Sequence, residues 1–440
     1  MSHAANVRPT KRLFIDALTS DLEVVDAIND LVDNCEDAAR ASTAQKGALG
    51  HFKVEIIFSE DRFEIKDNCG GIPAEVAEKY AFRLGRPDDF KGAKGTIGRF
   101  GIGMKRAMFL IGKKINVKSK TINSSFEIIL DVDKWIEAGD NSWDIPFTTF
   151  EKQSSVQPSE VGTTITIENI NDDIKSELGS AIFRNQLIEE LQKRHKSALM
   201  AGMQIKVGAA LLISEPYQIK KSDFIVPAFH SEKLNGRGRE PIQLKLIAGI
   251  EESKPAEAGW YIACNGRFIL VADRSSKTGW GDMGSVMIPK MHHQFARFRG
   301  YAFFECDDPA RLPWNSTKTG VSSESPIFKK ARQLMVAMTR PVIDALNLLD
   351  KELDLDVRPL EDALKASPSV PITSLLDGFA EHSFKFEPSL QSDANPDRLI
   401  RIAYSKPLRL VKQVRAKLGV EQNRDVGAKT FEYFAKNELK

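Results

Sequence analysis

The stretch AINDLVDNCEDAA, residues 27–39, combines the pattern of a buried helix with an unusual number of carboxylates. Apolar residues recur at helical spacing over residues 22–40, which predicts a helix with one face against a core. Asp30, Asn34 and Asp37 follow at i, i+4 and i+7, so they share a second face of that helix. Such a face usually meets water, but a carboxylate and an amide one turn apart also suit a water molecule and a metal ion.

Length and composition set broad limits on the protein. A chain of 440 residues is long enough for two or three domains, each with its own core. A net charge of +2 gives no bulk attraction for nucleic acid, so any such binding depends on local patches. The four cysteines form no CxxC pair, which favours a reducing compartment over a structural zinc site. The sequence shows neither a signal core nor a membrane-length apolar run, and it predicts a cytoplasmic protein.

Short strands and glycine-rich loops follow the first helix. KVEIIF (53–58), FEIKD (63–67) and GTTITIENI (162–170) alternate as strands do, and DNCGGIP (67–73) is a loop signal. Six glycines and many charges between residues 85 and 107 predict a mobile loop that leads into a helix. This order of elements predicts an α+β protein whose first part is an α/β sandwich, with helices on one face of a mixed sheet.

Two glycine segments bear on the helix with the carboxylates. GRFGIG (98–103) precedes a helical pattern, an arrangement that exposes backbone N–H groups to a phosphate chain. It is not the dinucleotide fingerprint, because no βαβ unit with a ribose-binding acid follows it. DNCGG (67–71) places a carboxylate beside closely approachable backbone, which suits an adenine amine. Each segment alone is commonly a turn, but together they favour a nucleotide site.

Four segments in this order resemble the nucleotide-binding motifs of one family. They are DLVDNCEDA (30–38), DNCGGI (67–72), GRFGIGMK (98–105) and GTT (162–164). The family is that of the GHKL ATPases, which include DNA gyrase B, MutL, topoisomerase VI, heat-shock chaperones of the same fold, sensor histidine kinases and MORC proteins. The run GIGMKRAMFLIGKK looks most like the MORC branch and its prokaryotic relatives. The resemblance covers about residues 15–170 and implies an ATP site in the Bergerat fold.

The resemblance also implies roles for individual residues. Asn34 would ligate Mg²⁺, Asp67 would bind the adenine amine and Thr163 would support that contact through water. Asp30 and Lys318 would be catalytic. Gly98, Gly101 and Gly103 would wrap the phosphates as part of a lid, with Lys105 nearby, and nucleotide would order the lid over about residues 86–100. The full set of implied cofactor-binding residues is Asn34, Asp37, Asp67, Gly71, Ile72, Gly98, Arg99, Gly101, Ile102, Gly103, Lys105 and Thr163.

Two positions depart from the family pattern. The catalytic position is usually Glu, whereas here it is Asp30, whose carboxylate is retracted by about 1.5 Å. A misplacement of about 1 Å can cost on the order of a hundredfold in rate, so hydrolysis is expected to be slow unless the helix lies closer to the nucleotide. Cys69 replaces the first glycine of the D-x-G-x-G motif, and Gly70 and Gly71 are expected to preserve the bend.

The later part of the chain divides into three further segments. Residues 176–348 resemble the ribosomal-S5-like transducer domain of gyrase, MutL and MORC proteins, with NGR (265–267) as a hairpin turn. In LPWNSTKTGV (312–321), Lys318 matches a lysine that senses the terminal phosphate, a task that suits an ammonium on a flexible stem. The predicted domains are the ATP-binding domain (1–175), the transducer (176–348), an acidic, Pro-rich linker (349–396) and a basic helical module (397–440).

The resemblance implies an ATP- and Mg²⁺-dependent switch or clamp. Nucleotide would order the lid and join two chains into a homodimer, and hydrolysis through water held by Asp30 would reopen it. DNA or nucleic-acid-associated proteins are further expected partners, and no membrane is expected. For the basic C-terminal helix, a solvated amphipathic helix and a phosphate-backbone contact both stay open.

The Asp30 departure motivates an alternative, a nucleotide-binding module that hydrolyses weakly or not at all and presents surfaces to partners. Phosphotransfer is disfavoured because only His3 precedes the first motif. A peptide-folding chaperone is disfavoured because the lysine loop and the C-terminal tail are more typical of the DNA-associated branches.

Overall fold

The structure is a computed structural model. It describes residues 9–43, 48–83, 96–97, 101–139, 142–236, 239–281, 288–315, 318–352, 358–376, 381–387, 402 and 404–439. The chain divides into two units. The first comprises Met1–Leu353 with Arg358–Ser389, and the second comprises Asp354–Val357 with Leu390–Lys440.

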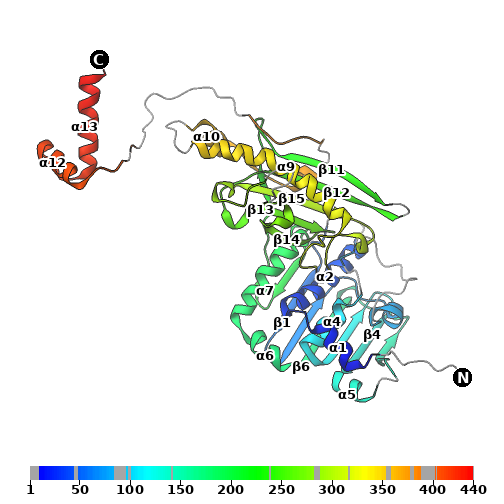
Figure 1. The fold of residues 1–440 in the computed structure, drawn as a ribbon. Helices are drawn as coiled ribbons and strands as arrows, with labels where there is room; N and C mark the ends of the chain where they lie inside the picture. The colour runs from blue at the N-terminus through cyan, green and yellow to red at the C-terminus, as the bar shows by residue number, and fades with distance from the viewer. Residues whose placement is uncertain are drawn as a thin grey trace. The chain divides into compact units, whose positions relative to one another are not determined.

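The first unit begins with an eight-stranded mixed sheet (Figure 1). The strand order is β5-β4-β3-β6-β2-β1-β7-β8, and every neighbouring pair is antiparallel except β1 and β7. The strands are β1 (Lys53–Phe58), β2 (Arg62–Asp67), β3 (Gly112–Lys120), β4 (Ser125–Asp131), β5 (Phe147–Glu151), β6 (Gly162–Ile170), β7 (Gln204–Val207) and β8 (Ala210–Leu211). The strands predicted at 53–58, 63–67 and 162–170 are confirmed.

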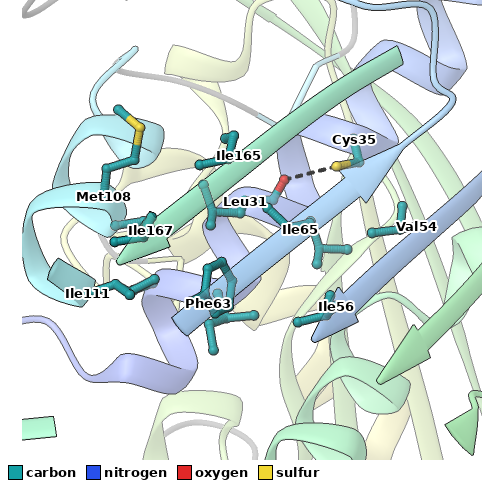
Figure 2. Close-up of a cluster of buried hydrophobic side chains, with 14 of the residues drawn as sticks. Leu31, Cys35, Val54, Ile56, Phe63, Ile65, Met108, Ile111, Ile165 and Ile167 are labelled. Carbon is teal, nitrogen blue, oxygen red and sulfur yellow. Dashed lines mark hydrogen bonds between the residues drawn. The ribbon is translucent and has the colours of Figure 1, made fainter. Parts of the chain in front are cut away.

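Helices cover one face of this sheet, which confirms the predicted layering. The helical elements are α1 (Lys11–Thr19), α2 (Val24–Ser42), α3 (Ala74–Val76), the π-helix η1 (Ala77–Ala81), α4 (Gly103–Ile111), α5 (Val132–Glu137), η2 (Pro158–Glu160), α6 (Asp172–Gly179), α7 (Ala181–Arg194) and α8 (Lys196–Met200). Burial alternates along β1, and Ile57 and Ile129 lie exposed on the opposite face. Figure 2 shows side chains of α2 and α4 in one cluster with those of β1, β2 and β6.

The first core extends further along the chain than predicted. We expected a domain boundary at 175/176, but β7 pairs in parallel with β1, and Phe183 and Leu212 belong to the same hydrophobic cluster as α2. The structure differs because a parallel pair needs a crossover, and α6, α7 and α8 form it. Such a pairing is set by tertiary contacts that local patterns do not reveal.

A second sheet of five strands follows in the same unit, in the order β11-β12-β15-β13-β14. Its strands are β11 (Ala228–Gly236), β12 (Arg239–Ile250), β13 (Gly259–Cys264), β14 (Arg267–Asp273) and β15 (Phe298–Glu305). The short 3-10 helices are η3 (Pro255–Glu257), η4 (Ser276–Thr278), η5 (His293–Phe295) and η6 (Pro309–Arg311). The long helix α9 (Pro326–Lys351) contacts β12 and β15 (Figure 1). The predicted NGR hairpin turn is confirmed, since β13 pairs with β14 around it.

The segment predicted as a weakly structured linker, residues 349–396, contains ordered elements instead. They are α10 (Pro359–Ala366), β16 (Ser369–Pro371), α11 (Thr373–Leu376) and β17 (Lys385–Phe386). β16 pairs with β9 (Gln218–Lys220), and β17 pairs with β10 (Ile225–Val226). Leu364, Ile372 and Leu375 are buried. These few apolar side chains attach the otherwise polar segment to the second sheet. Average composition conceals such anchors.

The second unit holds two helices, α12 (Leu408–Leu418) and α13 (Asn423–Glu438), which confirms the predicted helical C-terminus. Gly419 ends α12 in the left-handed conformation, with φ of 62°. Neither helix has a buried residue. Within the described part of the chain, every helix is too short or too polar to span a membrane.

Candidate nucleotide site

Helix α2 carries the residues expected at the centre of the site. Asp30 is 7% exposed, whereas Asn34, one turn later, is exposed. The Asn34 side-chain nitrogen donates a hydrogen bond to the backbone carbonyl of Asp30 at 2.9 Å. This bond occupies the amide nitrogen, so the side-chain oxygen is the atom that a cation would bind.

A small cavity of about 60 Å³ lies between α2, β2, β6 and the start of α4. Its lining includes five of the predicted cofactor-binding residues: Asn34, Asp67, Gly71, Ile72 and Thr163. The other lining residues are Leu31, Cys35, Ala38, Ile65, Met104 and Ile165. The cavity therefore has apolar walls with a few polar groups, as expected for the base of a nucleotide.

Asp67 ends β2 at the bottom of this cavity. One of its oxygens accepts a hydrogen bond from the Cys69 N–H at 2.7 Å, and the other accepts one from the Cys35 thiol at 3.6 Å. Burial raises the pKa of Asp67, although hydrogen bonds from Cys69, Cys35 and Thr163 oppose the shift. The carboxyl is thus fixed in orientation and partly desolvated, which strengthens any hydrogen bond with a ligand amine.

The loop after Asp67 makes the bend that the substituted motif was expected to keep. Gly70 and Gly71 adopt φ values of 104° and 71°, a region that glycine enters without steric cost. A Cβ atom on Gly71 would lie 2.1 Å from the carbonyl oxygen of Lys120. A Cβ atom on Gly162 would lie 1.9 Å from the carbonyl oxygen of Asp67. These glycines let the motif at 67–72 and the motif at 162–164 come together.

Ser119 is a site residue that sequence reasoning missed. Its buried hydroxyl accepts a hydrogen bond from the Ile72 N–H at 2.7 Å and lies 2.9 Å from the Thr163 hydroxyl. Ser119 thereby connects two walls of the cavity. The only signal is its register in β3, where it pairs with Thr163 of β6, and this pairing is visible only once the strands are placed.

The phosphate side of the site is described in part. Gly98 and Arg99 lie outside the described residues. Gly101 has a φ of 65°, and Ile102 directly precedes α4. A Cβ atom on Gly103 would lie 3.1 Å from a carboxylate oxygen of Asp30, so the N-terminus of α4 lies directly against Asp30. The free N–H groups of a helix N-terminus are a favourable place for a phosphate.

Lys105 lies elsewhere than expected. Its ammonium donates a hydrogen bond to the carbonyl of Ala81 at 2.8 Å, and its side chain lines a different cavity of about 510 Å³. Met104 lines the small cavity instead. The physical reason is the helical rotation of about 100° per residue, which turns Lys105 away when its neighbour faces the site.

Asp37 holds one end of the predicted lid. Its carboxylate accepts a hydrogen bond from the Ile97 N–H at 2.6 Å. Ile97 is fully buried and belongs to the hydrophobic core around α9 and β12. The side chain of Asn265, in the NGR turn, donates to the carbonyl of Thr96 at 3.0 Å. Residues 96–97 are thus held by both domains of the first unit, the first domain around the eight-stranded sheet and the second domain around the five-stranded sheet.

Lys318 comes from the second domain and meets α2. Its ammonium lies 3.2 Å from an Asp30 oxygen and 2.6 Å from an Asp33 oxygen. Burial alone would lower the pKa of Lys318, but Asp33 and Asp30 outweigh it and raise the pKa. The Lys318 backbone has a φ of 56°, a left-handed conformation that is uncommon for residues other than glycine. Trp314, at the base of that loop, is buried and pairs with Val321.

Asp33 and Glu36 form a second polar cluster that was not assigned from the sequence. Both are fully buried. Asp33 forms an ion pair with Arg267. Glu36 accepts two hydrogen bonds from Arg40, at 2.9 and 2.6 Å, and pairs with His195 at 3.0 Å. Burial alone would raise the pKa of Asp33, but Arg267 and Lys318 hold it below its ordinary value. The cluster is therefore charged although it is buried.

The described residues contain no cluster of three or more His, Cys, Asp or Glu side chains that could hold a metal ion. Mg²⁺ with a nucleotide needs no such cluster, because it commonly takes one or two protein oxygens, phosphate oxygens and water. Asn34 is an exposed residue that lines the cavity, and its side-chain oxygen fits this requirement. When bound, the ion would neutralise phosphate charge.

Residues 22–163 match the family described as histidine kinase-, DNA gyrase B-, and HSP90-like ATPase. The chain thus carries a GHKL-type ATPase domain in this range, which implies ATP binding and hydrolysis. The matched range contains α2, the loop after Asp67, α4 and Thr163, and so it includes every wall of the small cavity except Ile165. A comparison of the chain with curated proteins found no match.

Proposed function

We propose that this protein is an ATP- and Mg²⁺-dependent conformational switch that dimerises when it binds nucleotide. The observation that carries the proposal is the position of Lys318, which belongs to the second domain but lies 3.2 Å from Asp30 of the ATPase domain. A cation at this position would meet the terminal phosphate of ATP but not of ADP. Nucleotide state would then change the contact between the two domains.

Each candidate residue has a task in this proposal. Asp67 would accept a hydrogen bond from the adenine amine, and Thr163, held by the hydroxyl of Ser119, fixes the wall beside it. Asn34 binds Mg²⁺ through its side-chain oxygen. Asp30 orients or deprotonates the attacking water. The close packing of Gly103 against Asp30 supports this role, because it brings the N-terminus of α4 toward a carboxylate that is one methylene short.

The second domain supports the proposed role of an S5-like transducer. It is an α+β element that follows the ATPase domain and places a lysine loop and the NGR turn against α2 and residues 96–97. A relation to MORC-type proteins and a DNA clamp are parts of the same proposal. The exposed basic residues of the second unit support them: Lys406, Arg409, Lys412 and Lys417, with no acidic residue between them. If α12 is instead only a solvated amphipathic helix that covers its own small module, the protein should show no salt-dependent DNA binding through it.

The first test is nucleotide affinity measured by calorimetry with a non-hydrolysable ATP analogue, with and without Mg²⁺. Asn34→Ala is expected to weaken Mg²⁺-dependent binding at least tenfold. Asn437→Ala is a matched control, because Asn437 also donates its side-chain amide to a carbonyl four residues earlier, at 2.7 Å, on an exposed helix. Unchanged affinity in Asn34→Ala would contradict the proposed site.

The second test separates the switch from a module that binds nucleotide without hydrolysing it. Asp30→Ala should abolish steady-state phosphate release if Asp30 activates water. An unmeasurable rate in the unmodified protein, with intact nucleotide binding, would support the non-hydrolysing module. Light scattering with the ATP analogue, with ADP and with added duplex DNA then tests the dimer. A monomer under all three conditions would remove the clamp and leave the ATP site in place.

A further inference from the structure

The carboxylate of Asp33 is shared between two cations of the second domain. One oxygen forms an ion pair with a terminal nitrogen of Arg267, and the other accepts a hydrogen bond from Lys318 at 2.6 Å. All three residues are buried, with 8% exposure at most. Hydrogen bonds between charged groups are strong where little water surrounds them. The strength of the Asp33–Lys318 contact therefore depends on how much of the Asp33 negative charge Arg267 already neutralises.

The Arg267 side chain has few hydrogen-bond partners other than Asp33. It is fully buried, and among the described residues its Nε and Nη2 atoms have no hydrogen-bond partner. Its Nη1 atom bonds Asp33 and also lies 3.3 Å from Nε2 of His195. The Nδ1 atom of that histidine lies 3.0 Å from Glu36. A buried guanidinium with so few partners is costly, and it depends on Asp33 for compensation.

The backbone of Arg267 is held in place by a tight turn. The residue begins β14 directly after the tight turn at Asn265 and Gly266, where φ is 48° and 86°. Asn265 exchanges hydrogen bonds with the backbone of Cys306 at 2.9 and 3.0 Å. The Arg267 backbone is therefore held within the second domain while its guanidinium contacts Asp33 and His195 of the first domain, whereas Lys318 is the cation on a long flexible stem that can change partner.

We propose that Asp33 is the resting partner of Lys318, and that Arg267 is a positioning residue which sets how readily Lys318 leaves Asp33 and hence how strongly the site prefers ATP to ADP. The inference rests on the proposed function, in which Lys318 senses the terminal phosphate. Arg267 neutralises part of the Asp33 charge, so it weakens the hold on Lys318. Asp33 and Arg267 together then set the strength with which Lys318 of the second domain is held against the first domain.

The test is the ratio of affinities for a non-hydrolysable ATP analogue and for ADP, measured by calorimetry. Asp33→Asn removes the stronger contact of Lys318, so we expect affinity for the analogue to rise about tenfold with ADP unchanged. Arg267→Met leaves Asp33 to Lys318 alone, so we expect affinity for the analogue to fall about tenfold with ADP unchanged. A purely structural role would move both variants in the same direction.

Three further variants complete the experiment. Arg267→Lys keeps the charge and should restore most of the ratio. The double variant Asp33→Asn/Arg267→Met removes both charges, should fold even if a single variant does not, and should resemble Asp33→Asn. Arg299→Met is the matched control, because Arg299 is 2% exposed in the same domain and bonds backbone carbonyls away from the site. It should leave the ratio unchanged.

The outcomes distinguish the inference from the function on which it rests. Shifts in the same direction for Asp33→Asn and Arg267→Met, equal shifts for ADP, or a double variant that resembles Arg267→Met would each overturn the inference. Lys318→Met with an unchanged ratio, or no nucleotide binding by the unmodified protein, would instead overturn the proposed function. Circular dichroism of each variant establishes that the compared proteins are folded.

Discussion

Helix α2 has two polar faces with different surroundings. On one face, Asn34 is exposed beside the small cavity. On the other, Asp33 and Glu36 are fully buried, and residues from distant parts of the chain neutralise them. In the sequence both sets are carboxylates and amides in a single helical stretch. The comparison shows that polar residues of a single helix can either stay exposed beside a cavity or be enclosed by the protein's own charges.

The difference has an energetic consequence. A buried ionised group is tolerated only when partners compensate for lost hydration, so each member of the closed face depends on the others. A polar group on the open face exchanges bonds with water and can be removed at little cost to folding. Mutations on the two faces should therefore affect different quantities: stability on the closed face and ligand affinity on the open face.

The largest expected effect is on the closed face. Glu36→Ala leaves His195 and Arg40 without their carboxylate, and removing one partner of such a buried pair costs about 3–5 kcal/mol. Asn34→Ala should change the free energy of unfolding by less than about 0.5 kcal/mol. Urea unfolding at pH 7 measures both.

The dependence of the Glu36 effect on pH sharpens this comparison. Burial alone would raise the pKa of Glu36, but His195 and Arg40 outweigh it and lower the pKa. A carboxyl with a depressed pKa stabilises the fold fully above its unfolded pKa of about 4.3 and loses this contribution as the pH falls through the folded pKa. The difference between the unmodified protein and Glu36→Ala should shrink below about pH 4. A difference that stays constant would show that packing, not charge, causes the loss.

The next effect concerns the wall opposite α2. Gly71→Ala forces a Cβ atom to within 2.1 Å of a backbone carbonyl at a φ of 71°, so we expect a loss of about 2–4 kcal/mol and weaker binding of both ATP and ADP. Gly208→Ala is the matched control. Gly208 has a φ of 58° but open space around it, so only the conformational cost of about 1 kcal/mol remains. Equal losses would contradict the close packing of Gly71 against the backbone of Lys120 at the end of β3.

The sequence predicted the open face better than the closed face, for a physical reason. α2 and the strands at 53–58 and 162–170 follow from local periodicity, and the residues around the cavity come from the resemblance of four short motifs to those of the GHKL ATPases. Arg267 and His195 could not be found in this way. Each becomes a partner of α2 only through long-range packing, and its own neighbourhood in the sequence gives no sign of that contact.

Lys105 shows the limit of motif spacing itself. Its place in GRFGIGMK suggested a phosphate contact, yet the rotation of α4 directs Met104 to the cavity and Lys105 to the carbonyl of Ala81. The sequence pattern defines the polar face of α2 within a long helix, but it does not define the first residue of α4. An uncertainty of one residue at a helix start is enough to change which side chain reaches a site.

The smallest expected effect tests this rotation. Lys105→Met keeps much of the buried volume and removes the ammonium, so we expect ATP and ADP affinities to stay within about twofold of the unmodified protein. Met104→Ala, one residue earlier, should weaken both nucleotides severalfold because it removes part of the cavity wall. Calorimetry on the pair measures both effects. A tenfold loss of affinity for the ATP analogue in Lys105→Met, with the ADP affinity unchanged, would contradict this expectation. It would mean that α4 rotates when nucleotide binds and brings Lys105 to the phosphates. The nucleotide site would then include a residue that lies outside the small cavity in this structure.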